Sequence, residues 1–294
     1  MSHNTLKSHV EIIAEIGINH EGDVEQCAKM IELAAEAGVD AVKLQTIDAD
    51  SNYVEGTESY QVFKGSELTR DETAQMFDLA HSLGIKVFTT SGDLPTVEWV
   101  NKLNPDFWKI SSGLLTHLPM IEVLANLGRP LLISTGLGTV EEIDRAIALV
   151  RENGNPEIVL FQCTSLYPAP MNTLNLGTIP WMRERYDVEV GFSDHSIGTD
   201  AAFLSVGVGA TMIEKHFTLD AKRPGFDHAI SLEPTGFSEM VQRIRLAEVM
   251  LGDSRKSISA SQEQMRNKFL RTVVALRDIM EGESLNEDNV GVKR

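Results

Sequence analysis

The chain has 294 residues, of which 42% are hydrophobic and 23% charged, and its formal net charge is −17. This length and composition suit a globular protein with one large α/β domain or two average ones. The acidic balance argues against nucleic acid or an anionic membrane as the main partner, because both require basic patches. It does not exclude a small anionic substrate. The two cysteines do not indicate a disulfide framework, the N-terminus lacks a signal core, and no apolar run approaches membrane-spanning length, so we expect a cytoplasmic protein.

Eight short apolar runs alternate with segments of helical periodicity. Several runs are almost continuously apolar, as expected for strands buried on both faces. Segments such as 24–38 repeat apolar residues at helical spacing, and Asp71 and Thr139 are suitable N-caps for later helices. In chain order, the predicted strands are Glu11–Ile18, Ala41–Thr46, Lys86–Ser91, Phe107–Ser112, Pro130–Gly136, Glu157–Thr164, Val188–Asp194 and Thr211–Leu219.

Eight strands alternating with about eight helices over ~250 residues predict a (β/α)8 TIM barrel. An open, doubly wound sheet is the alternative. The position of the polar residues favours the barrel, since they gather at the carboxyl ends of the runs, where barrels build their sites. These residues are Glu15, Lys43, Gln45, Thr90, Lys109, Ser112, Ser134, Ser165, His195 and His216.

Three segments fall outside the repeating pattern. The long polar insertion 48–70 is a candidate lid or substrate loop. The barrel domain is predicted to cover residues 1–251, and the polar, serine-rich segment 252–268 is predicted to be a linker. Residues 269–294 suggest a strand and a turn but are too few to bury a core of their own.

His195 and His216 end the seventh and eighth predicted strands. Adjacent strands in a barrel lie ~5 Å apart, so both imidazoles can reach one ion. Two imidazoles leave several coordination positions open, which suits a catalytic divalent metal. Carboxylates close to the histidines or to other strand ends are Glu15, Asp194, Glu214 and Asp227. The alternative is structural: His195 caps the next helix and His216 packs beneath a loop.

Lys43 and Lys109 lie inside apolar runs, where an unpaired ammonium is costly to bury. Each lysine either pairs with a carboxylate or binds an anionic ligand. The hydroxyl groups at neighbouring strand ends would complete a cradle for phosphate or carboxylate; they belong to Thr90, Ser111, Ser112, Ser134 and Ser193. Two alternatives remain: lysines extending to solvent, or a Schiff-base lysine of an aldolase.

Two glycine-containing segments could contribute to the same site. Residues 134–138 (STGLG) open a predicted helix and could bind phosphate through backbone N–H groups. Residues 223–228 (RPGFDH) look like a loop that carries Asp227 over the barrel mouth; a plain surface turn is the alternative.

The segments IIAEIGINHEGD, AVKLQT, FWKISSG, LLISTG, CTSLYPAP, GFSDHSIG, IEKHFTLD and FDHAISLEP, in this order, resemble the sialic acid synthase family. The resemblance runs from about Ile12 to Leu251 and implies a metal-dependent transferase that condenses phosphoenolpyruvate with N-acetylmannosamine or a related N-acetylated hexose. The products would be a sialic-acid-type 2-keto sugar acid and phosphate. The closing residues 269–294 resemble the beginning of the family's antifreeze-like (SAF) domain.

The resemblance also implies roles for individual residues. His195 and His216 match the metal ligands, for Mn²⁺ or Mg²⁺, while Glu15, Asp227 and Lys109 match residues at the reacting centre. Tyr167 and Asp227 match sugar-contacting positions, and a homodimer is expected. The positions that match phosphoenolpyruvate-binding residues are Lys43, Thr90, Lys109, Ser112, Ser134, Ser165 and Ser193.

Three features depart from the family pattern. Leu114 stands where the family has an acidic residue that contacts the sugar, so we expect different acceptor contacts there. The third predicted strand ends TTSGD where the family tends to have STP. The sequence as given ends at Arg294, before the segment of the antifreeze-like domain that supplies an arginine to the partner's sugar site.

Two other functions compete with the synthase on the same barrel. The first is a Schiff-base aldolase that uses Lys109 or Lys43 and needs no metal. The second is a non-catalytic barrel that binds a sugar or a phosphorylated ligand without turnover.

Overall fold

The computed structural model of the chain describes residues 9–155, 157–252 and 256–294. The chain divides into two compact units, Met1–Gly252 and Asp253–Arg294. All the residues expected to carry chemistry belong to the first unit.

The first unit is a closed barrel of eight parallel strands in the order β1 to β8, with β8 pairing back onto β1. The prediction of a (β/α)8 barrel is confirmed, and the open doubly wound sheet is wrong. The strands are β1 (Glu11–Gly17), β2 (Ala41–Thr46), β3 (Lys86–Ser91), β4 (Trp108–Ile110), β5 (Leu131–Ser134), β6 (Ile158–Cys163), β7 (Glu189–Asp194) and β8 (Met212–His216).

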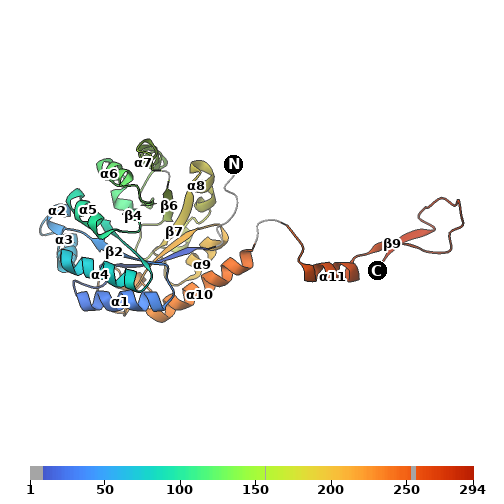
Figure 1. Cartoon of the computed structure of the whole chain (residues 1–294), viewed down its shortest axis with the longest axis horizontal. Helices are drawn as coiled ribbons and strands as arrows, with labels where there is room; N and C mark the ends of the chain where they lie inside the picture. Colours follow the sequence, from blue (N-terminus) through green and yellow to red (C-terminus); the bar gives the residue numbers. More distant parts are fainter. Residues whose placement is uncertain (1–8, 156, 253–255) are drawn as a thin grey trace. The chain divides into compact units, whose positions relative to one another are not determined.

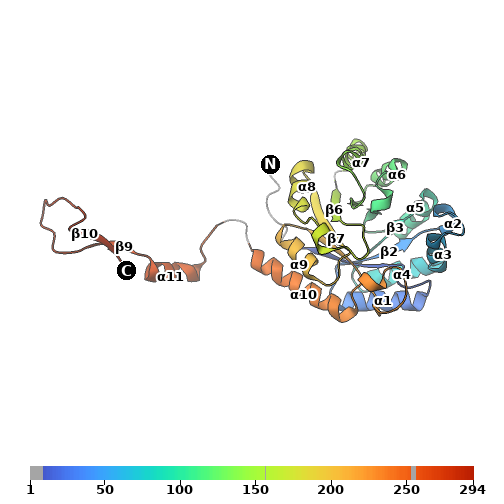
Figure 2. The ribbon, with the colours of Figure 1, turned by 180° about the vertical axis from the view of Figure 1, so that it is seen from behind.

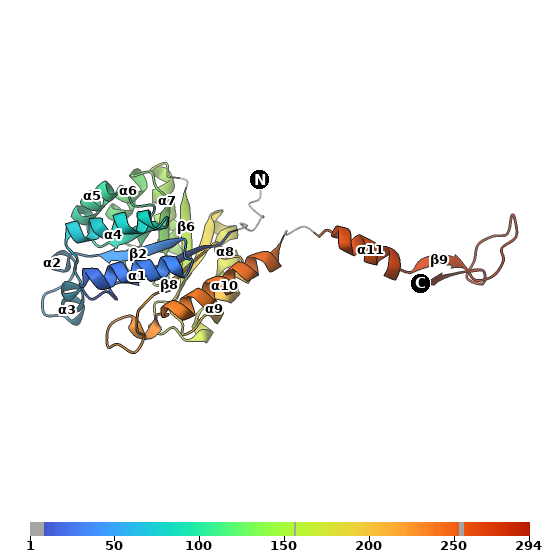
Figure 3. The same ribbon diagram turned by 60° about the horizontal axis from the view of Figure 1, so that its bottom comes forward.

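Helices follow the strands and cover the outside of the barrel (Figure 1). Seen from behind, α9 and α10 lie side by side (Figure 2), and α10 also packs beside α1 (Figure 3). The covering helices are α1 (Val24–Glu36), α4 (Arg70–Ser82), α5 (Leu94–Val100), α6 (Leu118–Asn126), α7 (Val140–Glu152), α8 (Thr178–Tyr186), α9 (Asp200–Gly207) and α10 (Pro234–Leu251). Short 3-10 turns at Asn101–Leu103, Ser112–Leu114, Met171–Thr173 and His228–Ile230 complete the loops.

Two apolar cores follow from the alternation of side chains along each strand. The larger core lies between strands and helices and includes Ile12 of β1, Val42 of β2 and Ile213 of β8. The smaller core fills the barrel interior; its members are Ile13, Ala41, Phe88, Phe107, Leu132, Val159, Phe161 and Met212. These side chains fill the interior and form an apolar floor. The inward-facing polar residues lie above this floor, nearer the carboxyl ends of the strands.

Helix starts follow the capping rules, with one correction. Thr139 caps α7 and forms a reciprocal capping box with Glu142, as predicted. The predicted cap Asp71 is wrong: Thr69 caps α4 in a capping box with Glu72, and Asp71 lies in the first turn. The Thr69 hydroxyl and the Glu72 carboxylate each satisfy a free backbone N–H, which Asp71 at this register does not.

The insertion 48–70 is folded rather than extended. It contains α2 (Ala49–Asn52), capped by Asp48, and α3 (Glu58–Gly65), capped by Thr57. The Tyr53 and Phe63 rings stack with centroids 4.8 Å apart and join the two helices.

The second unit is small. It contains α11 (Ala260–Phe269) and the antiparallel pair β9 (Thr272–Ala275) and β10 (Val290–Lys293). Most of the predicted linker 252–268 is therefore helical from Ala260 onward, because Ser259 and Gln262 form a capping box. No apolar side chain of residues 256–294 belongs to a buried core. In the part of the chain that the structure describes, no helix is long and apolar enough to cross a membrane.

Candidate active site

A cavity of about 450 Å³ opens at the carboxyl ends of the strands. Parallel strands in a closed barrel all end at the same rim, so residues far apart in sequence meet there. All twelve residues predicted for the site line this cavity: Glu15, Lys43, Thr90, Lys109, Ser112, Ser134, Ser165, Tyr167, Ser193, His195, His216 and Asp227.

Strand register sets which of these side chains are neighbours. Residue Glu15 of β1 is paired with Lys43 of β2 on one side and with His216 of β8 on the other. Thr90 of β3 is paired with Lys109 of β4. On β8, Glu214 and His216 are two residues apart and so point to the same side of the strand.

Glu214 joins the two lysines at the base of the cavity. Its Oε2 accepts from Lys43 Nζ at 2.8 Å and from Lys109 Nζ at 3.0 Å, while Ser193 Oγ donates to its Oε1 at 2.8 Å. Lys109 is 1% exposed and also lies over the Phe161 ring. A buried charge is stable only with such partners, so neither lysine extends to solvent.

The electrostatics of this array follow from burial and charge. Burial alone would raise the pKa of Glu214, but the two ammonium groups hold it below its ordinary value. Burial lowers the pKa of Lys109, and the negative charge of Glu214 offsets this effect only in part. Burial also disfavours the charged form of Lys43, but two carboxylates, Glu15 and Glu214, overcome this and raise its pKa. An ammonium carries three donors, and among the described residues Lys109 Nζ uses one of them, on Glu214, so donors remain for an anionic ligand.

Glu15 and Asp227 are carboxyl groups with altered acidity. Burial raises the pKa of Glu15 to about 7, with the positive charge of Lys43 opposing the shift. Gln45 Nε2 donates to Glu15 Oε1 at 2.8 Å, and Glu15 Oε2 lies 3.3 Å from Lys43 Nζ. Burial raises the pKa of Asp227 to about 6. Groups of this kind are suited to proton transfer near neutral pH.

His195 and His216 lie with ring centroids 5.5 Å apart. His195 Nδ1 contacts the Thr164 carbonyl oxygen at 2.9 Å. When Nδ1 carries the proton, that bond leaves Nε2 with a free lone pair. His216 is 5% exposed, and burial lowers its pKa, which favours the neutral, ligand-competent ring. Tyr167 covers the pair, with its ring centroid 4.3 Å from that of His195.

Two observations on these residues favour a divalent metal, and a third limits the ligands that the protein itself supplies. Metal–imidazole bonds are about 2 Å long, so two rings this close can share one ion. His216 Nδ1 and Asp227 Oδ1 are buried and have no hydrogen-bond partner among the residues that the structure describes, and Asp227 Oδ2 lies 3.7 Å from His216 Nδ1. Within residues 9–155, 157–252 and 256–294, no group of three or more His, Cys, Asp and Glu side chains is arranged to hold a metal. The described side chains thus offer two neighbouring imidazoles to an ion but not a complete set of ligands.

Serine hydroxyls also line the cavity, from the 3-10 turn after β4 (Ser112), from β5 (Ser134) and from the loop after β6 (Ser165). Ser112 Oγ accepts from the Gly136 backbone N–H at 3.0 Å. A side chain at Gly136 would collide with Ser165 Oγ, because a Cβ there would lie 2.5 Å from it. Glycine in the predicted STGLG segment therefore allows the backbone to approach the serines.

Aromatic rings from outside the barrel close one flank of the cavity. Tyr53 and Phe63 come from the insertion, and Phe226 comes from the loop between β8 and α10. Phe63 contacts Phe226 edge-on, with ring centroids 6.5 Å apart. The insertion thus contributes to the cavity wall.

Two residues considered from the sequence lie outside the cavity. Asp194 faces away from the barrel interior and pairs with the fully buried Lys215 at 3.0 Å. Leu114 does not line the cavity; its side chain packs against the larger apolar core. The structure gives no support to the expectation that position 114 contacts the acceptor, because Leu114 follows the cavity-lining Ser112 and Gly113 but packs against the larger core.

We therefore expect Leu114→Ala to lower stability by about 1–3 kcal/mol through lost apolar packing, and to leave the acceptor preference unchanged. Thermal unfolding and kcat/KM ratios for paired acceptors measure the two effects. A changed acceptor ratio at unchanged stability would place Leu114 at the ligand.

A closed (β/α)8 barrel with this cavity at the carboxyl ends of its strands defines the chain as a TIM-barrel protein whose candidate active site lies where such barrels build their sites. The chain belongs to the NeuB family, whose sequence pattern matches residues 30–256. The resemblance to sialic acid synthases is thereby confirmed.

Individual relatives agree with this assignment. The chain is 39% identical to an uncharacterised protein of Methanocaldococcus jannaschii, over 96% of this chain and 84% of that protein. It is 35% identical to the N,N'-diacetyllegionaminic acid synthase of Legionella pneumophila, over 95% of this chain and 83% of the relative. The N-acetylneuraminic acid synthetase of Leptospira borgpetersenii, crystallised with citrate, has a similar structure: TM-score 0.84, 30% identity, 89% of this chain and 92% of that one.

Proposed function

We propose that this chain condenses phosphoenolpyruvate with the open-chain aldehyde of an N-acetylated hexose, giving a sialic-acid-type 2-keto sugar acid and phosphate. The observation that carries the proposal is the pair Lys43 and Lys109, held together by Glu214 in the same cavity as His195 and His216. Cationic donors next to an open pair of imidazoles suit a substrate that brings both an anion and a carbonyl group.

In this reaction Lys43 and Lys109 bind the phosphate and carboxylate of phosphoenolpyruvate, assisted by the serine and threonine hydroxyls of the cavity. A Mn²⁺ or Mg²⁺ ion held by His195 and His216 would supply Lewis-acid polarisation of the aldehyde oxygen. The methylene carbon forms a bond to the aldehyde carbon, and positive charge develops at the second carbon of phosphoenolpyruvate. Water adds there, giving one proton to the former aldehyde oxygen. The carbon–oxygen bond to phosphate then breaks, and phosphate leaves with the remaining proton.

Glu15 and Asp227 are the carboxyl groups available for these proton transfers. Their pKa values, raised by burial to about 7 and about 6, allow each group to accept and return a proton near neutral pH. Tyr167 and the aromatic flank of Tyr53, Phe63 and Phe226 support a sugar acceptor, since ring faces pack against the apolar face of a small ligand.

The test is phosphate release from phosphoenolpyruvate with Mn²⁺, with and without a chelator, against a panel of N-acetylated hexosamines. We expect release that requires one of the sugars and stops when chelator is added. Binding of phosphoenolpyruvate without release for any acceptor would contradict the proposed condensation.

A Schiff-base aldolase is the second candidate, because burial lowers the pKa of Lys109 and so favours its nucleophilic free amine. Borohydride reduction with a keto substrate, followed by mass spectrometry, separates the two reactions. A covalent adduct on Lys109 together with chelator-resistant turnover would replace the synthase.

The family resemblance supports two further parts of the proposal, a homodimer and a cytoplasmic location. Light scattering of the full chain tests the first, and cell fractionation tests the second.

A further inference from the structure

The loop between β8 and α10 carries Asp227 to the cavity, but the carboxylate has little to hold it there. Asp227 Oδ1 is buried and, among the residues that the structure describes, has no hydrogen-bond partner. Oδ2 lies 3.7 Å from His216 Nδ1, beyond hydrogen-bond distance. The position of this carboxylate therefore depends on the backbone of its loop.

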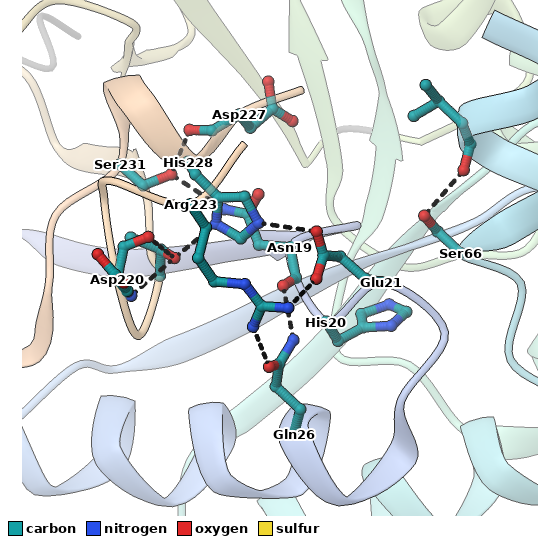
Figure 4. A network of polar contacts seen from close by, with 12 residues as sticks. Asn19, His20, Glu21, Gln26, Ser66, Asp220, Arg223, Asp227, His228 and Ser231 are labelled. Atoms are coloured by element: carbon teal, nitrogen blue, oxygen red, sulfur yellow. Dashed lines mark hydrogen bonds and ion pairs between the residues drawn. The ribbon is translucent and has the colours of Figure 1, made fainter. Parts of the chain in front are cut away.

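Buried contacts fix the two ends of the loop to the segment after β1. Ser231 Oγ donates to the Asp227 carbonyl oxygen at 2.6 Å. The Asn19 side chain donates to Ser231 Oγ and to the Phe217 carbonyl oxygen, both at 2.9 Å. Figure 4 shows Asn19 and Ser231 beside Asp227. Asn19 thereby ties the residues before and after the loop to one point.

His228 makes a second connection. Its ring is 2% exposed, with Nδ1 at 2.7 Å from Thr218 Oγ1 and Nε2 at 3.4 Å from Glu21 Oε1. A neutral ring satisfies both contacts when Nε2–H donates to Glu21 and Nδ1 accepts from the threonine hydroxyl. Gly225 provides space for the ring, since a Cβ there would lie 2.4 Å from His228 Cδ2.

Arg223 makes the third connection, from the loop to α1 (Figure 4). Its guanidinium donates to the Glu21 carboxylate and to the Gln26 side-chain oxygen. Glu21 thus contacts residues on both sides of Phe226 and Asp227 in the chain. Its own backbone has φ of 53°, a left-handed conformation that non-glycine residues rarely adopt. Strain of this kind persists where surrounding contacts enforce it, often at functional sites.

We propose that Glu21, Arg223 and His228 are positioning residues that hold the 220–231 loop so that Asp227 faces His216 in the cavity. The proposal rests on the proposed function for the role of Asp227. The Arg223–Glu21 pair is half-exposed, with side chains 38% and 37% accessible. Such pairs contribute little to folding stability, so Arg223 can be replaced without unfolding the barrel.

The first test measures the loop directly and needs no turnover. Hydrogen exchange of the Ile230 and Ser231 amides, which donate to the Asp227 and His228 carbonyls, is compared in the wild-type chain, Arg223→Ala and Arg243→Ala. Arg243 is the control because it also forms a solvent-accessible arginine–carboxylate pair, with Asp200 on the outer helices. We expect faster exchange in Arg223→Ala only. Unchanged exchange there would overturn the proposal.

The second test asks whether the effect acts through Asp227. Arg223→Ala is expected to lower kcat about 10- to 100-fold, because small displacements of catalytic groups are costly. The dissociation constant for phosphoenolpyruvate should stay unchanged, and Arg223→Lys should recover part of the lost activity. In an Asp227→Asn background, Arg223→Ala should have no further effect. An equal loss in both backgrounds would overturn the route through Asp227.

The two tests also distinguish a failure of the positioning proposal from a failure of the proposed condensation. Absence of turnover by the wild type with every acceptor would count against the condensation. The exchange experiment would still decide whether Glu21, Arg223 and His228 hold the loop.

Discussion

Replacement of Lys109 by Met is expected to weaken phosphoenolpyruvate binding by more than about 100-fold, because losing one member of a buried charged contact costs ~3 kcal/mol. The ammonium is nearly inaccessible to solvent in the free protein, so a bound anion would meet it without competing water. Calorimetric titration of the full chain with phosphoenolpyruvate measures the loss.

Met is the informative replacement because it keeps most of the volume and the contact with the Phe161 ring while removing the charge. Glu214 would keep its contacts with Lys43 and Ser193, so it would not become an isolated buried carboxylate. The barrel should therefore stay folded, which thermal unfolding can verify.

Lys86→Met is the matched control. Lys86 also lies on a barrel strand and pairs with a glutamate, Glu11, but at the opposite end of the barrel. Its replacement should leave the affinity for phosphoenolpyruvate unchanged. Equal affinities of wild type and Lys109→Met would remove Lys109 from the anion site and undermine the proposed reaction with it.

The fold was predictable because eight apolar runs alternate with helical segments, and polar residues gather at one end of each run. In a closed parallel barrel the carboxyl ends of all strands meet at one rim, so the polar residues at these ends are expected to line one cavity. Lys43 and Lys109 stood out from the sequence because a buried ammonium needs a partner.

Strand-end position alone does not single out Glu214, the partner of the two lysines, from the other candidate carboxylates. Asp194 has a similar position in the sequence but pairs with the buried Lys215 outside the cavity. The alternation of strand side chains could have separated them: Glu214 shares a face with His216, whereas Asp194 shares one with Phe192. If His216 points into the barrel, Glu214 must also point inward, because it lies two residues earlier on the same strand.

Other features depend on tertiary contacts that no local pattern encodes. Tyr53 and Phe63 reach the cavity because the insertion folds back beside Phe226. The contacts of Glu21 with the 220–231 loop join distant parts of the sequence: Arg223 and Glu21 are 202 positions apart. For Leu114 the resemblance gives a position in the sequence but not the direction of the side chain, which packs against the larger apolar core.

Replacement of His216 by Ala is expected to reduce phosphate release by roughly 1,000-fold or more, since Lewis-acid stabilisation of a developing oxyanion supplies several kcal/mol. His216 is a cleaner target than His195. Among the described residues its side chain makes no hydrogen bond, so removal breaks none, whereas His195 would lose its contact with the Thr164 carbonyl. The variant should keep the thermal stability of the wild type within ~1 kcal/mol.

Binding measurements separate a metal role from a general loss of the site. Mn²⁺ affinity, measured by the electron paramagnetic resonance of free Mn²⁺, should fall strongly in His216→Ala, while phosphoenolpyruvate affinity falls little, because Lys43, Lys109 and Glu214 remain in place. His81→Ala is the control, since His81 lies on α4 and pairs with Asp106 on the protein surface. If His216→Ala retained both Mn²⁺ binding and chelator-sensitive turnover, the metal would have to be held elsewhere. The buried His216 Nδ1 would then have to serve the substrate directly, as a hydrogen-bond partner for the acceptor.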